Sequence, residues 1–226
     1  MTRRLRYEWK VKSAMTVLLP AAFSGLYFWL ERHPRTAPFA MPVSPLDQAV
    51  PFQEWALWPY LSLYLLTPIG PWLADSRREL ARYVKGLGAL SCVAFAVFAV
   101  FPTGIVRPDP GALGPLYGAL TALDTALNAF PSLHAALAVY SALCCGPAVA
   151  ASRRPGLWRA LLLTWVLAIV YSTLATKQHV AVDAAAGLLL GALSFRWAYG
   201  GRAARSAASK GIDATREATD ERLQAA

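Results

Sequence analysis

Six long apolar runs dominate this sequence and limit the folds it can adopt. Each contains about 17 to 21 residues, which is the length that an α-helix needs to cross a bilayer core of ~30 Å. Because backbone groups in lipid must find hydrogen bonds within their own segment, runs of this length are expected to be helices. The runs cover residues 14–31, 55–74, 86–102, 131–151, 157–176 and 179–199. The pattern predicts an all-α, polytopic membrane protein with six transmembrane helices.

The composition agrees with a membrane protein. Hydrophobic residues make up 56% of the chain, charged residues 15%, and the mean hydropathy is +0.38, a balance that soluble domains rarely have. The first run follows a basic stretch, as the core of a signal peptide does. However, it is longer than a usual signal core and ends at residues 31–34 without a small-residue cleavage pattern. We therefore expect it to be a retained signal anchor.

The positive charge is distributed unevenly between the predicted loops. Eighteen of the 22 Lys and Arg residues lie in the N-terminal arm, the 75–85 loop, the 152–159 turn and the C-terminal end. The other loops carry only Arg32, Arg35, Arg107 and Lys177. By the positive-inside rule, this bias predicts a multi-pass protein of the cell membrane with both termini in the cytoplasm. The net charge of +9 is then a signal of topology, and we expect no nucleic-acid partner.

The chain is expected to form one membrane domain between two flanking segments. Residues 1–12 are interpreted as a basic cytoplasmic arm, residues 13–200 as the six-helix membrane domain, and residues 201–226 as a cytoplasmic tail that is either helical or disordered. Five prolines exclude a regular helix from the 32–54 loop, and three more predict kinks in the second run. Aromatic residues that flank the second run are interpreted as interfacial anchors, namely Trp55, Trp58, Tyr60, Tyr64 and Trp72. Residues 113–127 are expected to contain a short interfacial helix between the third and fourth spans.

Two polar stretches open the fourth and sixth runs, and they hold two of the three histidines. In the second stretch, His179 and Asp183 are four residues apart, which places them on one face of a helix. The carboxylate can then hold one imidazole nitrogen and leave the other as a free lone pair, as in an oriented base or nucleophile. The alternative is a polar pair that satisfies itself between two spans.

In the first stretch, Asn128 and Ser132 are suited to cap a helix, whereas His134 is not a favoured capping residue. A helix N-terminus has unpaired N–H groups that favour an anion. Arg107 and Lys177 are the cations that the topology brings near this cluster. Two cations, two histidines and a helix N-terminus predict a phosphoryl-binding cradle on the extracytoplasmic face.

These motifs resemble those of the type-2 phosphatidic acid phosphatase superfamily. Residues 130–134 (Phe-Pro-Ser-Leu-His) resemble its Pro-Ser-Gly-His motif, and residues 172–183 resemble its Ser-Arg-x5-His-x3-Asp motif. Arg107, followed by proline, matches the end of its Lys-x6-Arg-Pro motif. The resemblance implies that His179 attacks phosphorus, that Asp183 orients it, and that His134 acts as acid and then as base. It also implies phosphate contacts from Arg107 and Ser132.

The sequence departs from the family pattern at three positions. Val100 stands where the first-motif lysine is expected, Thr173 replaces an arginine, and Leu133 replaces a glycine. Lys177 is interpreted as restoring one lost charge. The remaining motif residues are predicted to line the substrate, which makes the full predicted substrate-binding set Arg107, Ser132, Lys177, Leu133, Ser172 and Asn128. The sequence Asn-Ala-Phe-Pro-Ser-Leu-His, together with Lys-Gln-His, is similar to sequences of the branch that contains inositol phosphorylceramide synthases.

Three functions remain open at this point. The first is a lipid phosphate phosphatase, and the second is a phosphotransferase that moves a phosphoryl head group to another lipid or alcohol. The third is a non-catalytic lipid transporter or a metal-binding scaffold, although two cations beside the histidines disfavour a metal ion. The resemblance implies a metal-independent enzyme with no cofactor. The expected partners are the bilayer and a lipid bearing a phosphate or diphosphate group, and a homo-oligomer is compatible with the sequence.

Overall fold

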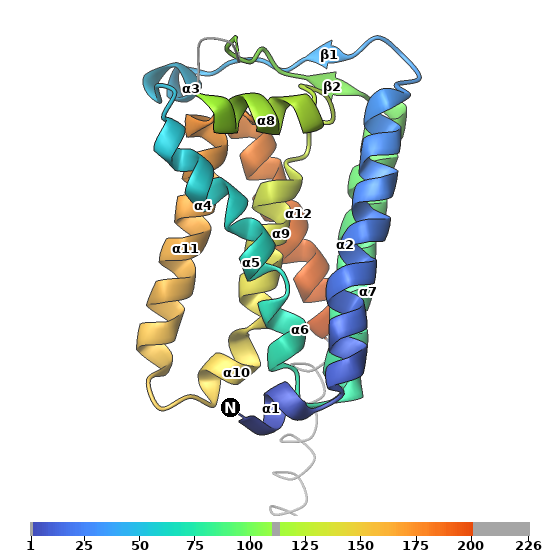
Figure 1. Cartoon of the computed structure of the whole chain (residues 1–226), viewed down its shortest axis with the longest axis vertical. Helices are drawn as coiled ribbons and strands as arrows, with labels where there is room; N and C mark the ends of the chain where they lie inside the picture. The colour runs from blue at the N-terminus through green and yellow to red at the C-terminus, as the bar shows by residue number, and fades with distance from the viewer. Residues whose placement is uncertain (1, 110–113, 201–226) are drawn as a thin grey trace, which may run out of the picture.

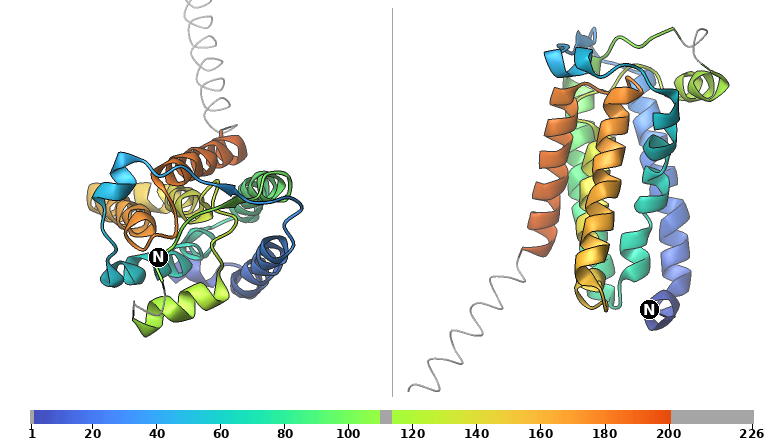
Figure 2. Two further views of the ribbon diagram at one scale, coloured as in Figure 1. Left: turned by 90° about the horizontal axis from the view of Figure 1, so that it is seen from above. Right: turned by 90° about the vertical axis from the view of Figure 1, so that its left-hand side faces the viewer.

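A computed structural model describes residues 2–109 and 114–200 of the chain. Five helical segments in this part are long and apolar enough to cross a membrane. They lie side by side as a bundle (Figures 1 and 2). The segments are α2 (Trp9–Arg32), α7 (Arg77–Val100), α9 with α10 (Leu133–Ala150), α11 (Pro155–Ala175) and α12 (Ala181–Tyr199). The predicted mostly helical membrane protein is confirmed to this extent, and the predicted tail lies outside the described residues.

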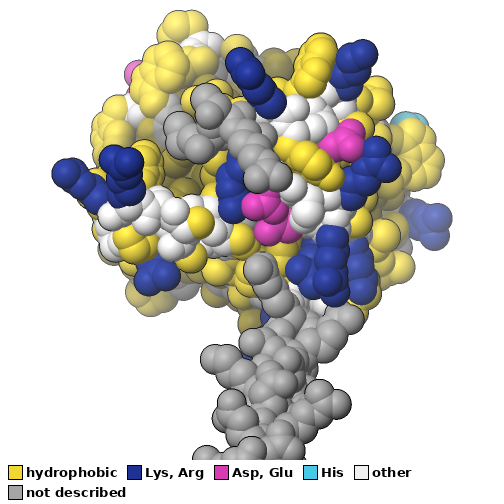
Figure 3. Space-filling model, turned by 90° about the horizontal axis from the view of Figure 1, so that it is seen from below, with side chains coloured by type: hydrophobic (Ala, Val, Ile, Leu, Met, Phe, Trp, Pro, Cys, Tyr) yellow, Lys and Arg dark blue, Asp and Glu magenta, His cyan; other side chains and the backbone are white. Residues whose placement is uncertain are grey.

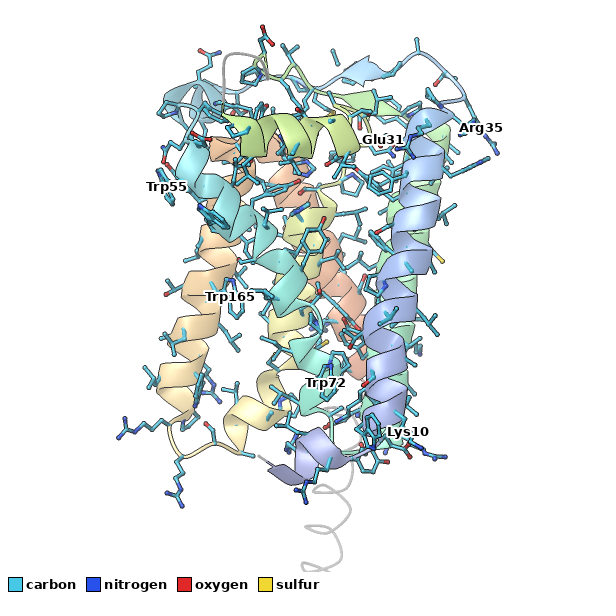
Figure 4. The ribbon with its side chains drawn as sticks, in the orientation of Figure 1. Lys10, Glu31, Arg35, Trp55, Trp72 and Trp165 are labelled. Atoms are coloured by element: carbon cyan, nitrogen blue, oxygen red, sulfur yellow. The ribbon has the colours of Figure 1, made fainter. Side chains whose placement is uncertain are left out.

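The second predicted run is not one helix. Residues 54–73 form a 3-10 turn and three short helices, which are η1 (Glu54–Ala56), α4 (Leu57–Leu61), α5 (Leu63–Leu66) and α6 (Ile69–Leu73). Pro59, Pro68 and Pro71 each lack a backbone N–H, so they cannot donate the hydrogen bonds of a continuous helix. The run is therefore divided into short helices and not only kinked as predicted. The three helices descend along α9 from one end of the bundle to the other (Figure 1). Trp165 of α11 supports them through a hydrogen bond from its indole nitrogen to Ser62 Oγ at 2.8 Å (Figure 4).

Helix α12 packs most closely against α9. A Cβ atom added at Gly187 would lie 2.2 Å from the carbonyl oxygen of Ser132, and one at Gly191 would lie 2.3 Å from that of Ala136. Glycines four residues apart on one helix face let two membrane helices approach closely. This close approach carries the two histidine-containing stretches to the same place.

The shorter elements gather at the two ends of the bundle. At one end, α8 (Pro115–Leu123) lies across the helices, beside α3 (Pro45–Ala49) and a two-stranded parallel pair, β1 (Phe39–Ala40) with β2 (Thr103–Gly104) (Figure 1). This small pair departs from the all-α prediction. It joins the proline-rich loop to the segment after α7, with Phe39 opposite Thr103. We call this the α8 end.

The opposite end carries the N-terminus, α1 (Thr2–Arg6) and the C-terminal end of α12, and we call it the basic end (Figures 1 and 2). Lys and Arg side chains are prominent on its surface (Figure 3). The predicted arm is not free here, because Lys12 is fully buried and donates to the carbonyl oxygens of Arg4, Trp72 and Ala74 at 2.6, 3.0 and 2.8 Å. The arm therefore packs against the turn that follows α6.

Candidate active site

His134 lies in the first turn of α9 at the α8 end. Ser132 is the N-cap of this helix, and its Oγ accepts a hydrogen bond from Ala135 N at 3.3 Å. Pro131 precedes this cap and lies outside the helix. The Nε2 atom of His134 is buried and has no hydrogen-bond partner. This nitrogen is therefore available to a ligand that enters the site.

The imidazole of His134 is held by an aromatic ring from the broken segment. Tyr60 of α4 stacks on it with ring centroids 3.9 Å apart and an interplanar angle of 17°. Tyr64 approaches the same imidazole edge-on at 6.2 Å. The sequence interpretation of Tyr60 as an interfacial anchor is wrong, because only 1% of this residue is exposed. In contrast, Trp55 is largely exposed, as expected for an anchor (Figure 4).

His179 lies in the loop before α12, not within the helix as predicted. Its Nδ1 atom is 3.1 Å from the carbonyl oxygen of Ala129 and 3.6 Å from Asp183 Oδ2. A carbonyl oxygen only accepts, so Nδ1 carries the proton and Nε2 keeps the free lone pair of the neutral ring. Asp183 thus shares the orienting role with a backbone carbonyl. Its Oδ2 also accepts from Val180 N at 3.1 Å, which caps α12.

The two histidine stretches are tied together directly. The backbone N–H of Ser132 donates to the carbonyl oxygen of Asp183 at 3.0 Å. The ring centroids of His134 and His179 are 6.2 Å apart with an interplanar angle of 51°. Both rings lie at the same end of the bundle, and this separation allows a single phosphoryl group to contact both.

Arg107 enters the site from the segment after α7. Its side chain is only 10% exposed, and its Nη1 donates to the carbonyl oxygen of Asp124 at 2.5 Å. Its Nε atom is buried and has no partner. The guanidinium lies close enough to interact electrostatically with His134. A buried cationic N–H without an acceptor is costly, so this group is suited to receive an anion.

Helix α2 supports the segment that holds Arg107. Tyr27 donates to Asp124 Oδ1 at 2.9 Å. Glu31 Oε1 accepts from the N–H and the hydroxyl of Thr125 at 2.7 and 2.8 Å. Glu31 is at the upper end of α2, close to α8 (Figure 4). The first span therefore contributes to the site although it carries none of the motifs.

Four other residues predicted to bind substrate have their polar groups, or their whole side chain, engaged elsewhere. Lys177 donates to the carbonyl oxygens of Asp47, at 2.8 Å, and of Val50, so its ammonium contacts the 32–54 loop. Ser172 Oγ donates to Ile169 O at 2.6 Å. Leu133 packs in the hydrophobic core, and the buried Asn128 donates from Nδ2 to Tyr27 O at 3.5 Å. These four residues therefore contact neighbouring parts of the protein and support the backbone around the site.

Sequence reasoning did not identify Tyr117 or Asp124 as site residues. Tyr117 of α8 is fully buried and its hydroxyl has no hydrogen-bond partner. Burial raises the pKa of this phenol, and the nearby Arg107 opposes the rise only in part; the group therefore remains a protonated donor at neutral pH. Neither residue belongs to a motif, and the only available signal was their place in the connection between two spans.

A metal centre finds no support among the described residues. No group of three or more His, Cys, Asp or Glu side chains in residues 2–109 and 114–200 is arranged to hold an ion. The guanidinium of Arg107 lies near His134, and its positive charge favours an anionic ligand over a cation on that side of the site.

The described residues thus form a helical membrane bundle that brings two histidines and a buried arginine together at one end, an arrangement suited to an anionic group such as a phosphate ester. Residues 84–206 match the model of the PAP2 superfamily. The match covers more than half of the chain and includes all the motif residues, so the protein belongs to this superfamily. Members of the family are phosphoesterases. No curated protein and no solved structure matches the chain.

Proposed function

We propose that this protein is a lipid phosphate phosphatase that works through a phosphohistidine intermediate without a metal ion. The observation that carries the proposal is the pair of imidazoles 6.2 Å apart, with His179 oriented through Nδ1 and His134 presenting an unpartnered Nε2. A hydrophobic substrate tail is suited to the surrounding bilayer, and its phosphate to the α8 end.

In the first step, Nε2 of His179 forms a bond to phosphorus while the bond from phosphorus to the lipid oxygen breaks. The phosphate anion of the bound substrate favours the protonated form of His134, which donates its Nε2 proton to that oxygen, so that the lipid leaves as an alcohol. Ala129 O and Asp183 hold the opposite nitrogen of His179, so the attacking lone pair is fixed in direction. Orientation and charge stabilisation account for most catalysis of phosphoryl transfer.

In the second step, water replaces the histidine. His134, now neutral, takes a proton from the water as its oxygen bonds to phosphorus, and the bond to His179 Nε2 breaks. Inorganic phosphate leaves, and both histidines return to their starting protonation states. Arg107 Nε and the N-terminus of α9 stabilise the phosphoryl oxygens throughout, because both present N–H groups to an anion.

We infer that the α8 end faces the extracytoplasmic side. The bias of Lys and Arg toward the basic end supports this orientation (Figure 3). In this arrangement α4, α5 and α6 together form a sixth, segmented crossing, buried on one side against α9 and α11. Irregular backbone at membrane depth is acceptable where protein covers it. Helix α8 then lies at the outer interface above the site.

A phosphotransferase is the second candidate. The same residues would perform it, with an alcohol in place of water in the second step. The sequence around Leu133 and His179, with its similarity to the branch that contains inositol phosphorylceramide synthases, favours this alternative. The acceptor depends on the shape of the pocket and not on the motif residues.

One experiment tests both candidates. Purified protein is incubated with phosphate-labelled lipids, including phosphatidic acid and polyprenyl diphosphates, with and without an added lipid alcohol and without added metal. Release of labelled inorganic phosphate supports the phosphatase, and label on a second lipid supports the transferase. If wild-type protein transfers label to neither acceptor from any lipid phosphate, the proposed function is wrong.

Arg107 should be essential for efficient use of the substrate. Replacing it with alanine is expected to lower kcat/KM by about 100- to 1,000-fold, because one donor to the transition-state oxygens is lost. Lysine should restore only part of this, since an ammonium cannot reproduce the guanidinium fork. The measurement is lipid phosphate hydrolysis in detergent micelles.

Arg35→Ala is the matched control for this prediction. Arg35 lies at the same end of the bundle and points away from it (Figure 4). Its removal should leave kcat/KM unchanged. Equal losses in the two variants would mean that Arg107 acts through general surface charge, which would remove it from the site.

A further inference from the structure

The 32–54 loop is bound to the segment that carries His179. Within this loop, α3 begins after Ser44, which caps it together with Asp47. Just beyond α3, the backbone N–H of Gln53 donates to Ala175 O at 2.9 Å. The 32–54 loop itself lies outside the family motifs and upstream of the matched residues 84–206.

Asp47 forms the central contact of this attachment. Its side chain reaches the first residue of α12, where Oδ1 accepts from the backbone N–H of Ala181 at 2.7 Å. Its Oδ2 accepts from Ser44 N at 2.7 Å and from Ser44 Oγ at 2.6 Å. The residue is only 7% exposed. One carboxylate thus joins the start of α3 to the start of α12, two residues beyond His179.

Lys177 forms the second attachment, two residues before His179. Its ammonium donates to the carbonyl oxygens of Asp47, at 2.8 Å, and of Val50. Its backbone has a positive φ of 54°, a conformation that costs a non-glycine residue free energy and that surrounding contacts must stabilise. The carbonyl contacts supply such stabilisation from a helix 130 residues away in the sequence.

The loop that carries His179, residues 176–180 between α11 and α12, is also bound on its inner side. The backbone N–H groups of Gln178 and His179 both donate to Thr173 O at 3.0 Å. His179 is therefore held from within by α11 and from outside by Lys177 and Asp47. Each of these bonds constrains the backbone that aims the imidazole.

We propose that Asp47 and Lys177 are positioning residues for His179. Their hydrogen bonds attach α3 to residues 177–181, and we call this attachment the clasp. This proposal rests on the proposed function of His179 as the nucleophile. A displacement of about 1 Å of an attacking group is enough to lower a rate by about 100-fold. The clasp keeps the loop in place without contacting substrate, so it acts on the chemical step and not on phosphate binding.

The test compares Asp47→Ala, Asp47→Asn and Lys177→Met with Gln48→Ala, an exposed neighbour on α3. Each purified variant is assayed for kcat, KM, the inhibition constant of inorganic phosphate, and thermal unfolding in detergent. We expect kcat to fall by about 10- to 100-fold in Asp47→Ala and Lys177→Met. We expect KM and the phosphate inhibition constant to stay within about twofold of wild type, since the groups proposed to bind phosphate are untouched. Gln48→Ala should equal wild type.

Asp47→Asn separates a loss of positioning from a failure to fold. An asparagine keeps an acceptor for Ala181 N but cannot accept from Ser44 N with its NH₂ group, so its kcat should lie between those of wild type and Asp47→Ala. Unchanged kcat in folded Asp47→Ala would overturn the clasp.

A higher inhibition constant of inorganic phosphate in Lys177→Met would also overturn the clasp. That result would mean that Lys177 binds phosphate directly. The parallel assay of wild type distinguishes the two proposals. Inactive wild type defeats the proposed function, whereas active wild type with fully active variants defeats only the clasp.

Discussion

Replacing His179 with alanine should abolish turnover and leave the bundle folded. The imidazole makes one side-chain contact to Ala129 O and one to Asp183, and Thr173 O still binds the loop through backbone N–H groups. The fold therefore loses little, but the reaction loses its proposed nucleophile. We expect kcat to fall by at least about 10,000-fold, in the range found when a covalent nucleophile is removed. Single-turnover labelling should also show no phosphorylated protein.

His33→Ala provides the matched control for this loss. This third histidine is exposed at the end of α2, where it stacks on Trp29 with ring centroids 5.2 Å apart. It lies outside both motifs, so its removal should leave kcat and protein labelling unchanged. Substantial turnover or labelling in His179→Ala would contradict the covalent mechanism.

Gly187→Ala should separate the two histidines without touching either. The new methyl group would lie 2.2 Å from the carbonyl oxygen of Ser132, and a backbone atom cannot move aside as the end of a flexible side chain can. Helices α9 and α12 must shift apart, at a cost of about 1 to 3 kcal/mol or more for overpacking. The shift acts on the Ser132–Asp183 hydrogen bond and on the spacing of the imidazoles. We expect kcat to fall by about 100-fold or more, together with a lower unfolding temperature in detergent.

Gly88→Ala is the control for a glycine-to-alanine change in a membrane helix. A Cβ at Gly88 of α7 meets nothing within 4 Å, so activity and unfolding temperature should match wild type. If Gly187→Ala retains full activity, close packing of α9 on α12 is not what sets the distance between the histidines.

The mostly helical membrane fold was predictable because lipid makes strong local demands. A backbone in a bilayer must satisfy its hydrogen bonds within each segment, so length and apolarity alone identify α2, α7, α11 and α12. The predicted ends of α11 and α12 are correct to within two residues, whereas α7 begins nine residues before the predicted run. The same reasoning failed for residues 55–74. Length and hydropathy did not reveal how far three prolines would divide that run, because breaks of this kind depend on neighbouring helices that cover the freed carbonyls.

The two motifs were also recognisable from spacing, and the structure brings His134, His179, Asp183 and Arg107 to one end of the bundle. Their partners were not recognisable. Tyr60 was interpreted as an anchor because aromatic residues near span ends usually are, whereas it stacks on His134. Lys177 was assigned to phosphate because of its charge, whereas its ammonium binds two backbone carbonyls of the 32–54 loop.

The sequence by itself determined most of the long helices, the charge bias along the chain and the candidate residues for phosphoryl chemistry, since each depends on composition and spacing within one segment. Only the tertiary structure decided which groups support them. The contacts of Ala129 O with His179, Asp124 with Arg107, and Asp47 with Ala181 join segments far apart in the chain. Such contacts depend on the register and direction of packed helices, which no local pattern encodes.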